Sequence, residues 1–174
     1  MNLRFINEDE LDECLKLLDP KYHNLNIKIK FYYNRLHVFV DYLRGEYNKE
    51  DFKLVMKSEG TCACYRPYIN QGINILVYSF NRNKYYQFWN NEIKYKKIQV
   101  MYDIYHEIRH AYQHQFAPKK FNEERIAYIS SGEGYSEQWI ERDANRFSRA
   151  MMGRHKDSIS KIVNLESKKW NVGK

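Results

Sequence analysis

The segment at residues 98–116 contains neither glycine nor proline, and Pro118 follows two residues after its end. Apolar side chains recur at helical spacing along one side of it, and ionisable side chains along the other. The apolar side comprises Met101, Ile104, Tyr105, Ile108, Ala111 and Tyr112; the polar side comprises Asp103, His106, Glu107, His110 and His114. The pattern predicts a long amphipathic helix that buries one side and presents a row of ionisable groups on the other.

Residues 106–110 of this helix read His-Glu-Ile-Arg-His, an HExxH motif. Two histidines four residues apart lie on the same helix face, so their ring nitrogens can bind one tetrahedral Zn²⁺. Glu107 lies about 100° around the helix from His106, which places its carboxylate beside the metal rather than on it. A general base for a zinc-bound water takes that position. The motif therefore predicts His106 and His110 as zinc ligands and Glu107 as the catalytic base.

A catalytic zinc site needs a third protein ligand and one open position. His114 lies about 12 Å along the helix axis from His106, so a straight helix cannot bring it onto the same metal. The longer HExxHxxGxxH motif recruits its third histidine through a glycine turn, but Gln113 occupies the glycine position here. The third ligand is therefore expected from another segment.

The next strongly helical segment, residues 136–152, offers that ligand. Glu141 borders the apolar stripe of this helix, and Asn145 stands one turn further on the same side. Asn145 is expected to hydrogen-bond a ligating histidine. Glu141 is the favoured ligand, while Asp143, about 200° away around the helix, and Glu137 are the alternatives.

HEIRHAYQ, followed some thirty residues later by ERDANRFS, resembles the HExxH…ExxAnxF pattern of small intracellular zinc peptidases of the ImmA/IrrE type. These include related phage and Firmicutes proteins, and the resemblance covers residues 100–152, about a third of the chain. It implies His106, His110 and Glu141 as zinc ligands and Glu107 as the base. It also implies an α+β, zincin-like (gluzincin-type) metallopeptidase fold, with a small antiparallel sheet, an HExxH active-site helix and an antiparallel edge strand beside the active site.

Such a site predicts hydrolysis of a peptide bond in an intracellular protein or peptide. Zn²⁺ polarises the scissile carbonyl and lowers the pKa of its bound water, and Glu107 passes the water proton to the leaving amine. The oxyanion needs a further donor, for which Tyr128, Tyr135 and His114 are candidates. Arg109 is expected on the polar rim of the site.

Strands early and helices late favour an α+β fold, with the whole chain, 1–174, as a single domain. Strands are expected at 26–33, 62–69 and 73–80, the last two joined by a turn at 70–72. The segment 73–80 is the candidate edge onto which an extended peptide substrate would pair. Helices are expected at 8–18, 49–57, 98–116, 136–152 and 157–167, whereas 36–43 fits a strand or a helix and 81–95 fits a loop or an irregular helix.

The chain carries 29 Lys and Arg against 22 Asp and Glu, a formal net charge of +7. Such an excess can hold nucleic acid, so weak nucleic-acid binding is expected, and a basic nucleic-acid-associated module is the alternative function. A non-catalytic zincin-like interaction protein is a further alternative. The basic clusters are Lys94, Lys96 and Lys97, and Arg146, Arg149, Arg154 and Lys156.

No apolar run is long enough to cross a membrane, and the acidic N-terminus differs from a signal peptide, so a cytoplasmic location and no membrane partner are expected. Cysteines would then be reduced. Cys62 and Cys64 form a CxC pair without a second pair at zinc-site spacing. Buried free thiols are therefore expected at both, and at Cys14. Nothing in the sequence specifies an oligomeric state.

Overall fold

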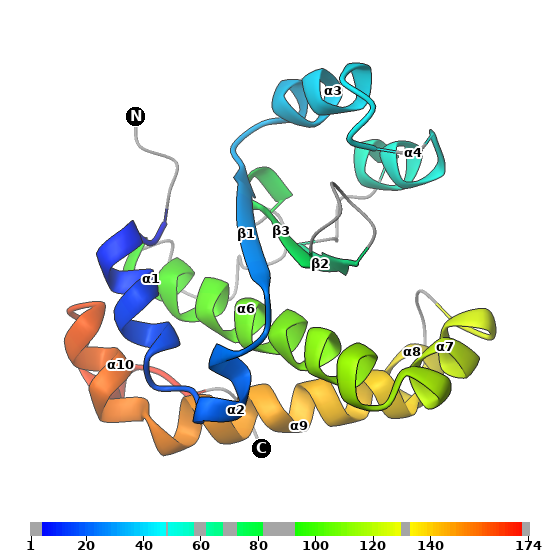
Figure 1. Cartoon of the computed structure of the whole chain (residues 1–174). Coiled ribbons are helices and arrows are strands. Elements are labelled where there is room, and N and C mark those ends of the chain that lie inside the picture. Colours follow the sequence, from blue (N-terminus) through cyan, green and yellow to red (C-terminus); the bar gives the residue numbers. More distant parts are fainter. Residues whose placement is uncertain are drawn as a thin grey trace.

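A computed structural model describes residues 5–47, 49–57, 62–67, 73–81, 93–129 and 133–171, without the side chains at 50, 73, 74, 93, 94 and 133. The chain has a mixed α+β fold that is mostly helical, with one three-stranded sheet (Figure 1). In chain order the elements are α1 (Glu8–Leu15), α2 (Pro20–His23), β1 (Ile27–Tyr32), α3 (Arg35–Leu43), α4 (Lys49–Lys57), β2 (Ala63–Arg66), β3 (Ile73–Tyr78), η2 (Ser79–Asn81), α6 (Ile93–Phe116), α7 (Pro118–Ile126), α8 (Glu133–Glu137), α9 (Trp139–Arg154), α10 (Lys156–Ile162) and η3 (Ser167–Lys169).

Most expected elements are present, with shifted ends. The ambiguous segment at 36–43 is helical, because the Asn34 side chain accepts a hydrogen bond from the His37 N–H and caps the start of α3. The helix predicted from residue 136 begins instead at Trp139, after the separate short helix α8. The predicted turn at 70–72 and most of the segment 81–95 lie outside the described residues.

The sheet is mixed, so the prediction of an antiparallel sheet was wrong. Its strand order is β1-β3-β2; β1 pairs with β3 in parallel, with Ile27 opposite Ile73, and β2 pairs with β3 antiparallel, with Ala63 opposite Val77. The parallel pair arises because the chain passes through α3, α4 and β2 between β1 and β3. Such a crossover can return the chain in its original direction.

The strand at Ile73–Tyr78 is central, so the prediction that it forms the edge was also wrong. Ile75 and Val77 pack into the larger core beneath the sheet, while Leu76 and Tyr78 pack into a second cluster on the opposite face. A continuous apolar run of this kind is typical of a strand buried on both faces. The edges are β1 and β2, and β2 packs against α6.

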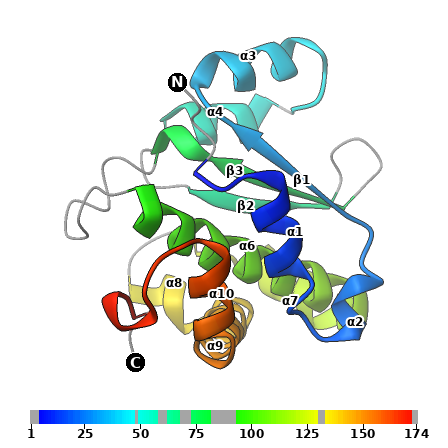
Figure 2. The same ribbon diagram turned by 90° about the vertical axis from the view of Figure 1, so that its left-hand side faces the viewer.

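Helix α6 lies between the sheet and α9, whereas α3 and α4 lie beyond the opposite face of the sheet (Figures 1 and 2). The larger core joins α1, α6, α9 and α10 to the sheet; its fully buried members include Met101, Ile104 and Tyr105 of α6 and Met152 of α9. Burial of this much apolar surface fixes the rotation of both long helices. The polar side of α6 is thereby held in one orientation.

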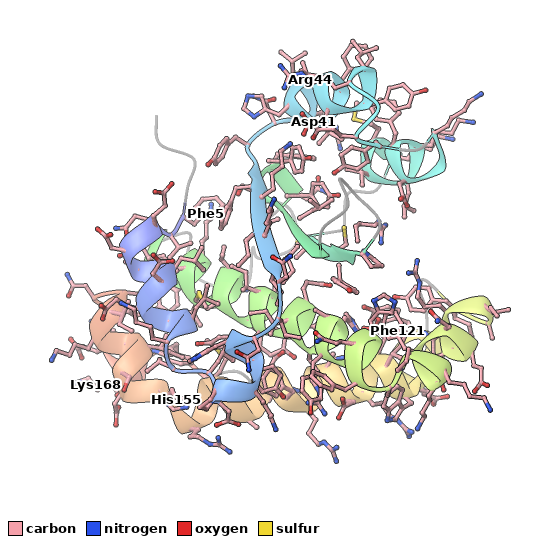
Figure 3. All side chains as sticks on the ribbon, viewed as in Figure 1. Phe5, Asp41, Arg44, Phe121, His155 and Lys168 are labelled. Carbon is pink, nitrogen blue, oxygen red and sulfur yellow. The ribbon has the colours of Figure 1, made fainter. Side chains whose placement is uncertain are left out.

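A buried polar group connects α3 to the sheet. The Tyr32 hydroxyl donates to Asp41 at 2.7 Å, and Lys30 pairs with Asp41 and with Glu46. Asp41 lies on α3 at the top of Figure 3. Burial opposes ionisation of Asp41, but Lys30 and Tyr32 outweigh it and hold the pKa of this carboxyl below its ordinary value. Among the described residues, no helix is both long and apolar enough to span a membrane.

Candidate metal centre

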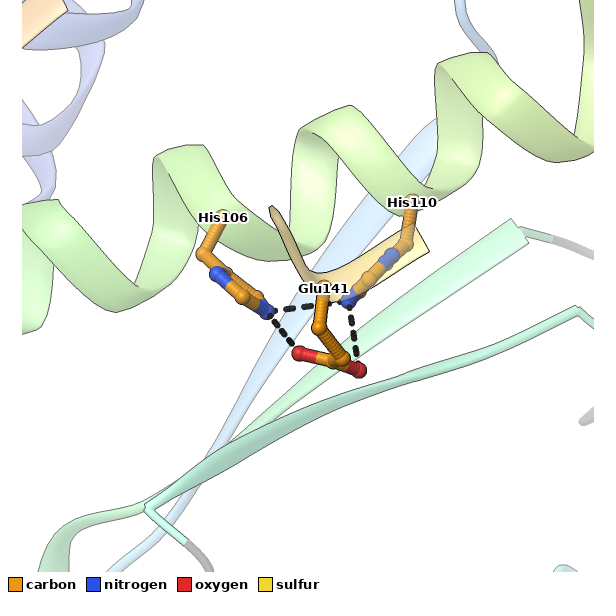
Figure 4. A group of neighbouring side chains, drawn as sticks. All are labelled: His106, His110 and Glu141. Carbon is orange, nitrogen blue, oxygen red and sulfur yellow. Dashed lines mark hydrogen bonds and ion pairs between the residues drawn. The ribbon is translucent and has the colours of Figure 1, made fainter. Parts of the chain in front are cut away.

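Three buried side chains converge between α6 and α9 (Figure 4). His106 and His110 lie one turn apart on α6, with their Nε2 atoms 2.9 Å from each other. Glu141, in the first turn of α9, places Oε2 at 3.1 Å from His106 Nε2 and Oε1 at 3.4 Å from His110 Nε2. The structure therefore brings together the three residues that the sequence predicted as ligands. All three are less than one tenth exposed.

The spacing of these donors fits one zinc ion. Donors bound to one tetrahedral Zn²⁺ at about 2.0–2.1 Å stand about 3.3 Å apart, and the separations of 2.9, 3.1 and 3.4 Å lie within about half an ångström of that value. Glu141 Oε2 approaches His106 without hydrogen-bond geometry and has no hydrogen-bond partner among the described residues. The ion pair with His106 is what this buried oxygen has in place of a hydrogen bond, and a cation bound among the three donors would satisfy it more fully.

The carboxyl groups of this cluster have opposite pKa shifts. Burial opposes the charge on Glu141, but attraction to His106 and His110 outweighs it and holds the Glu141 pKa far below its usual range. For Glu107, burial dominates and raises the pKa, with the two histidines opposing the rise and Glu141 adding to it. Glu107 is itself buried and lies outside the converging donor group. It is therefore a carboxyl close to the donors but separate from them, as predicted for a base.

Gln113 orients His110, a role that the sequence did not reveal. The Gln113 side chain is 2% exposed, and its amide nitrogen donates to the Ile140 carbonyl at 3.0 Å and to Asp143 Oδ2 at 2.9 Å. Both of those partners only accept, so the amide oxygen must face His110 Nδ1, 2.9 Å away. His110 then carries its proton on Nδ1, which leaves the Nε2 lone pair directed toward the metal position.

Asp143, the alternative ligand, forms hydrogen bonds with Arg109 and Gln113 instead of facing the metal position. It accepts from Arg109 Nε at 2.6 Å and from Arg109 Nη2 at 3.2 Å, and Arg109 Nη1 donates to the Tyr22 hydroxyl at 2.6 Å. Arg109 was expected on the polar rim. It is instead partly buried and links α6 to α9 and α2. The remaining alternative, Glu137, is exposed on α8 and outside the donor group.

Asn145 does not bond a ligating histidine, so that prediction was wrong. Its Oδ1 accepts instead from the Tyr102 hydroxyl at 3.0 Å. The reason is the direction of α9, which runs antiparallel to α6: Asp143 meets Arg109, and Asn145 meets the earlier residue Tyr102. One further turn along α9 therefore leads away from His110 rather than toward it.

Two of the three candidate oxyanion donors, Tyr128 and Tyr135, form hydrogen bonds with Glu141. The Tyr128 hydroxyl donates to Glu141 Oε1 at 2.9 Å, and burial raises the pKa of the phenol, which keeps the proton in place at neutral pH. The adjacent residue, Ile129, exchanges two backbone hydrogen bonds with the Gln138 side chain, at 2.9 and 2.8 Å, which hold this segment against the start of α9. His114 instead pairs with the Tyr65 hydroxyl of β2.

Tyr135 lies beside Tyr128, with ring centroids 6.1 Å apart and its own phenol pKa raised by burial. Cys14 and Cys64 are buried free thiols as expected, whereas Cys62 is only half-buried. Neither member of the CxC pair belongs to the donor group.

The cluster can hold one divalent cation on two imidazoles and a carboxylate, with a second carboxyl and a phenol close by.

Comparison of the chain with protein-family models, with curated proteins and with solved structures finds no match. The chemistry of the site is therefore inferred from its own residues.

Replacing Gln113 with Leu should weaken zinc affinity by about 10–100-fold, the usual effect of losing the partner that orients a ligating histidine. The change removes the acceptor at His110 Nδ1 while keeping a similar volume. The measurement is competition for zinc against a chromophoric chelator, with circular dichroism to verify folding. Asn145→Ala is the matched control and should bind zinc as the wild type does. Equal affinities for all three proteins would show that Gln113 has no influence on the metal ligands.

Proposed function

We propose that this protein is a zinc-dependent peptidase that hydrolyses a peptide bond in an intracellular protein or peptide. The observation that carries the proposal is the convergence of the His106, His110 and Glu141 donors on one buried point, with the separate carboxyl of Glu107 close by. Two imidazoles and a carboxylate form the ligand set of a catalytic zinc site that retains an open position.

The fold is consistent with a zincin-like architecture, which forms part of the proposal. Helix α6 carries the HExxH motif beneath a small sheet, and β2 is a terminal strand that runs antiparallel to β3 and packs against α6. The sequence resemblance implies an edge strand of this kind beside the active site. A peptide substrate in extended form would pair with β2, gaining main-chain hydrogen bonds without demands on its sequence.

Each residue of the site then has a defined role. His106, His110 and Glu141 would hold Zn²⁺, which when bound lowers the pKa of a coordinated water and polarises the scissile carbonyl. Glu107 removes the proton from the attacking water and delivers it to the leaving amine. We assign the oxyanion donor to the tyrosine pair Tyr128 and Tyr135, because both hydroxyls interact with the Glu141 carboxylate and keep their protons at neutral pH.

Metal removal tests the proposal directly. We expect about one zinc per chain after purification and dialysis, and cleavage of a proteome-derived peptide pool that stops when a chelator strips the metal and returns when zinc is restored. His106→Ala should neither hold zinc nor cleave. A wild-type protein that stays metal-free after incubation with equimolar zinc would contradict the proposed site. Zinc retention with no cleavage of the pool would contradict the peptidase and favour the zincin-like interaction protein.

A further inference from the structure

The exposed side of α9 carries four arginines and no acid. Its exposed residues are Arg142, Arg146, Arg149, Ala150, Gly153 and Arg154. The two acids of the helix, Glu141 and Asp143, are 2% and 7% exposed and face the metal centre and Arg109. The helix therefore separates its charges, with both negative groups inside and all four positive groups outside.

Three of these arginines form a stripe along an outer border of the molecule. Arg142, Arg146 and Arg149 follow the spacing of four and three residues that places side chains on one helix face. Helix α9 lies at the lower border in both Figure 1 and Figure 2, with α6 between it and the sheet. In Figure 3, side chains with nitrogen tips project downward from this helix.

Neighbouring acids leave this charge largely uncompensated. Arg146 approaches Asp143 at 3.3 Å, but Asp143 is already paired with Arg109 at 2.6 Å, and the Arg146 side chain remains 83% exposed. Arg154 approaches Asp19 only at 3.7 Å. The other basic cluster of the sequence differs in this respect, because Lys97 pairs with Glu10.

We propose that the outer face of α9 binds the phosphate backbone of a nucleic-acid duplex. The planar guanidinium forks of arginine match phosphate oxygens in a two-bond geometry. From Arg142 to Arg149 the stripe is about 10 Å long, and a duplex carries one negative charge per about 1.7 Å of its axis, so about six phosphate charges lie within reach.

The residues between the arginines favour nucleic acid over a lipid surface. Helices that bind membranes insert large apolar side chains into the lipid, but the exposed face of α9 offers only Ala150 and Gly153 besides its arginines. Asn145, the amide residue of this helix, bonds Tyr102 instead of facing outward. The proposed contacts are to the phosphate backbone, which carries no sequence information, so binding should be independent of nucleotide sequence.

The test is fluorescence anisotropy with a labelled random-sequence DNA duplex, titrated with the zinc-loaded full chain between about 50 and 200 mM NaCl. Three phosphate contacts predict that affinity falls by about 40-fold across this range, whereas one contact predicts a fall of about 3–4-fold. The triple variant Arg142→Gln, Arg146→Gln, Arg149→Gln should show the shallow dependence and weaker binding at low salt.

The matched control removes three positive charges from another helix. Lys49, Lys53 and Lys57 are exposed on α4, beyond the opposite face of the sheet. Replacing all three with Gln should leave the steep salt dependence in place. If both triple variants lost DNA affinity equally, net charge alone would explain the effect and the proposal would be overturned. Absence of DNA binding by the wild type at 50 mM NaCl would also overturn it. Binding to phosphatidylserine vesicles but not to DNA would also overturn it, in favour of a lipid surface. Zinc content verifies folding, and no outcome depends on peptide hydrolysis.

Discussion

Replacing Glu107 with Gln should lower peptide hydrolysis by about 10²–10⁴-fold, the usual effect of removing a general acid–base group, while zinc content remains that of the wild type. The amide keeps the size of the side chain but cannot take a proton from water. Zinc binding should persist because Glu107 lies outside the group of converging donors. The measurement is zinc per chain by elemental analysis together with initial rates on a peptide pool.

Glu137→Gln is the matched control for this variant. It makes the same chemical change at an exposed position of α8, so it should retain both zinc and hydrolysis. Equal cleavage by Glu107→Gln and the wild type would remove Glu107 from the role of base. The variant also has a practical use, because its intact binding surfaces should trap the substrate for identification.

Local periodicity predicted where the donors lie on each helix. His106, Glu107 and His110 all lie within two turns of one helix, so their relative positions follow from helix geometry. Glu141 was favoured over Asp143 because it borders the apolar stripe of its own helix and shares a side with Asn145. The first reason was sound, since α9 does turn that side toward the histidines, whereas the expected role of Asn145 was wrong. The meeting of Glu141 with histidines of another helix was implied by the sequence resemblance.

The prediction for Asn145, which depended on the direction of one helix relative to another, failed. The Asn145 interaction required the direction of α9 relative to α6, which no local pattern specifies. Gln113 had one local signal, since it stands three residues after His110 on the same helix face. Its other partners, Ile140 and Asp143, come from α9 and could not be read from that spacing.

For the sheet, too, the position of a strand could be predicted from the sequence but its pairing partners could not. The position of β3 was predicted, but its pairing with β1 depends on a crossover between distant segments. The consecutive buried residues from Ile75 to Tyr78 did contain the information that the strand is central, because an edge strand with one wet face would alternate. That pattern fits a central β3, so the proposed substrate-pairing edge is β2 instead.

Glu141→Gln should weaken zinc binding far more than Asp143→Asn, whereas both changes should lower the stability of the metal-free protein. Glu141→Gln removes the only carboxylate of the donor group, so zinc affinity should fall by more than the 10–100-fold typical of a lost outer partner. Asp143→Asn leaves all three donors in place but breaks the ion pair with Arg109, whose guanidinium is partly buried. The metal-free protein should lose roughly 1.5–3 kcal/mol of unfolding free energy, the range for a hydrogen bond to a charged group.

The two variants are compared by chelator competition for zinc and by urea unfolding of the metal-free proteins. Asp143→Asn should keep zinc affinity closer to wild type, because the Asn oxygen can still accept from Gln113 and so preserve the orientation of His110. Glu141→Gln should also lower the urea midpoint of the metal-free protein, because the low pKa of Glu141 means that His106 and His110 stabilise its charge in the folded state. Stronger loss of zinc in Asp143→Asn than in Glu141→Gln would mean that α9 presents its other side to the histidines in solution, and the ligand set would then be His106, His110 and Asp143.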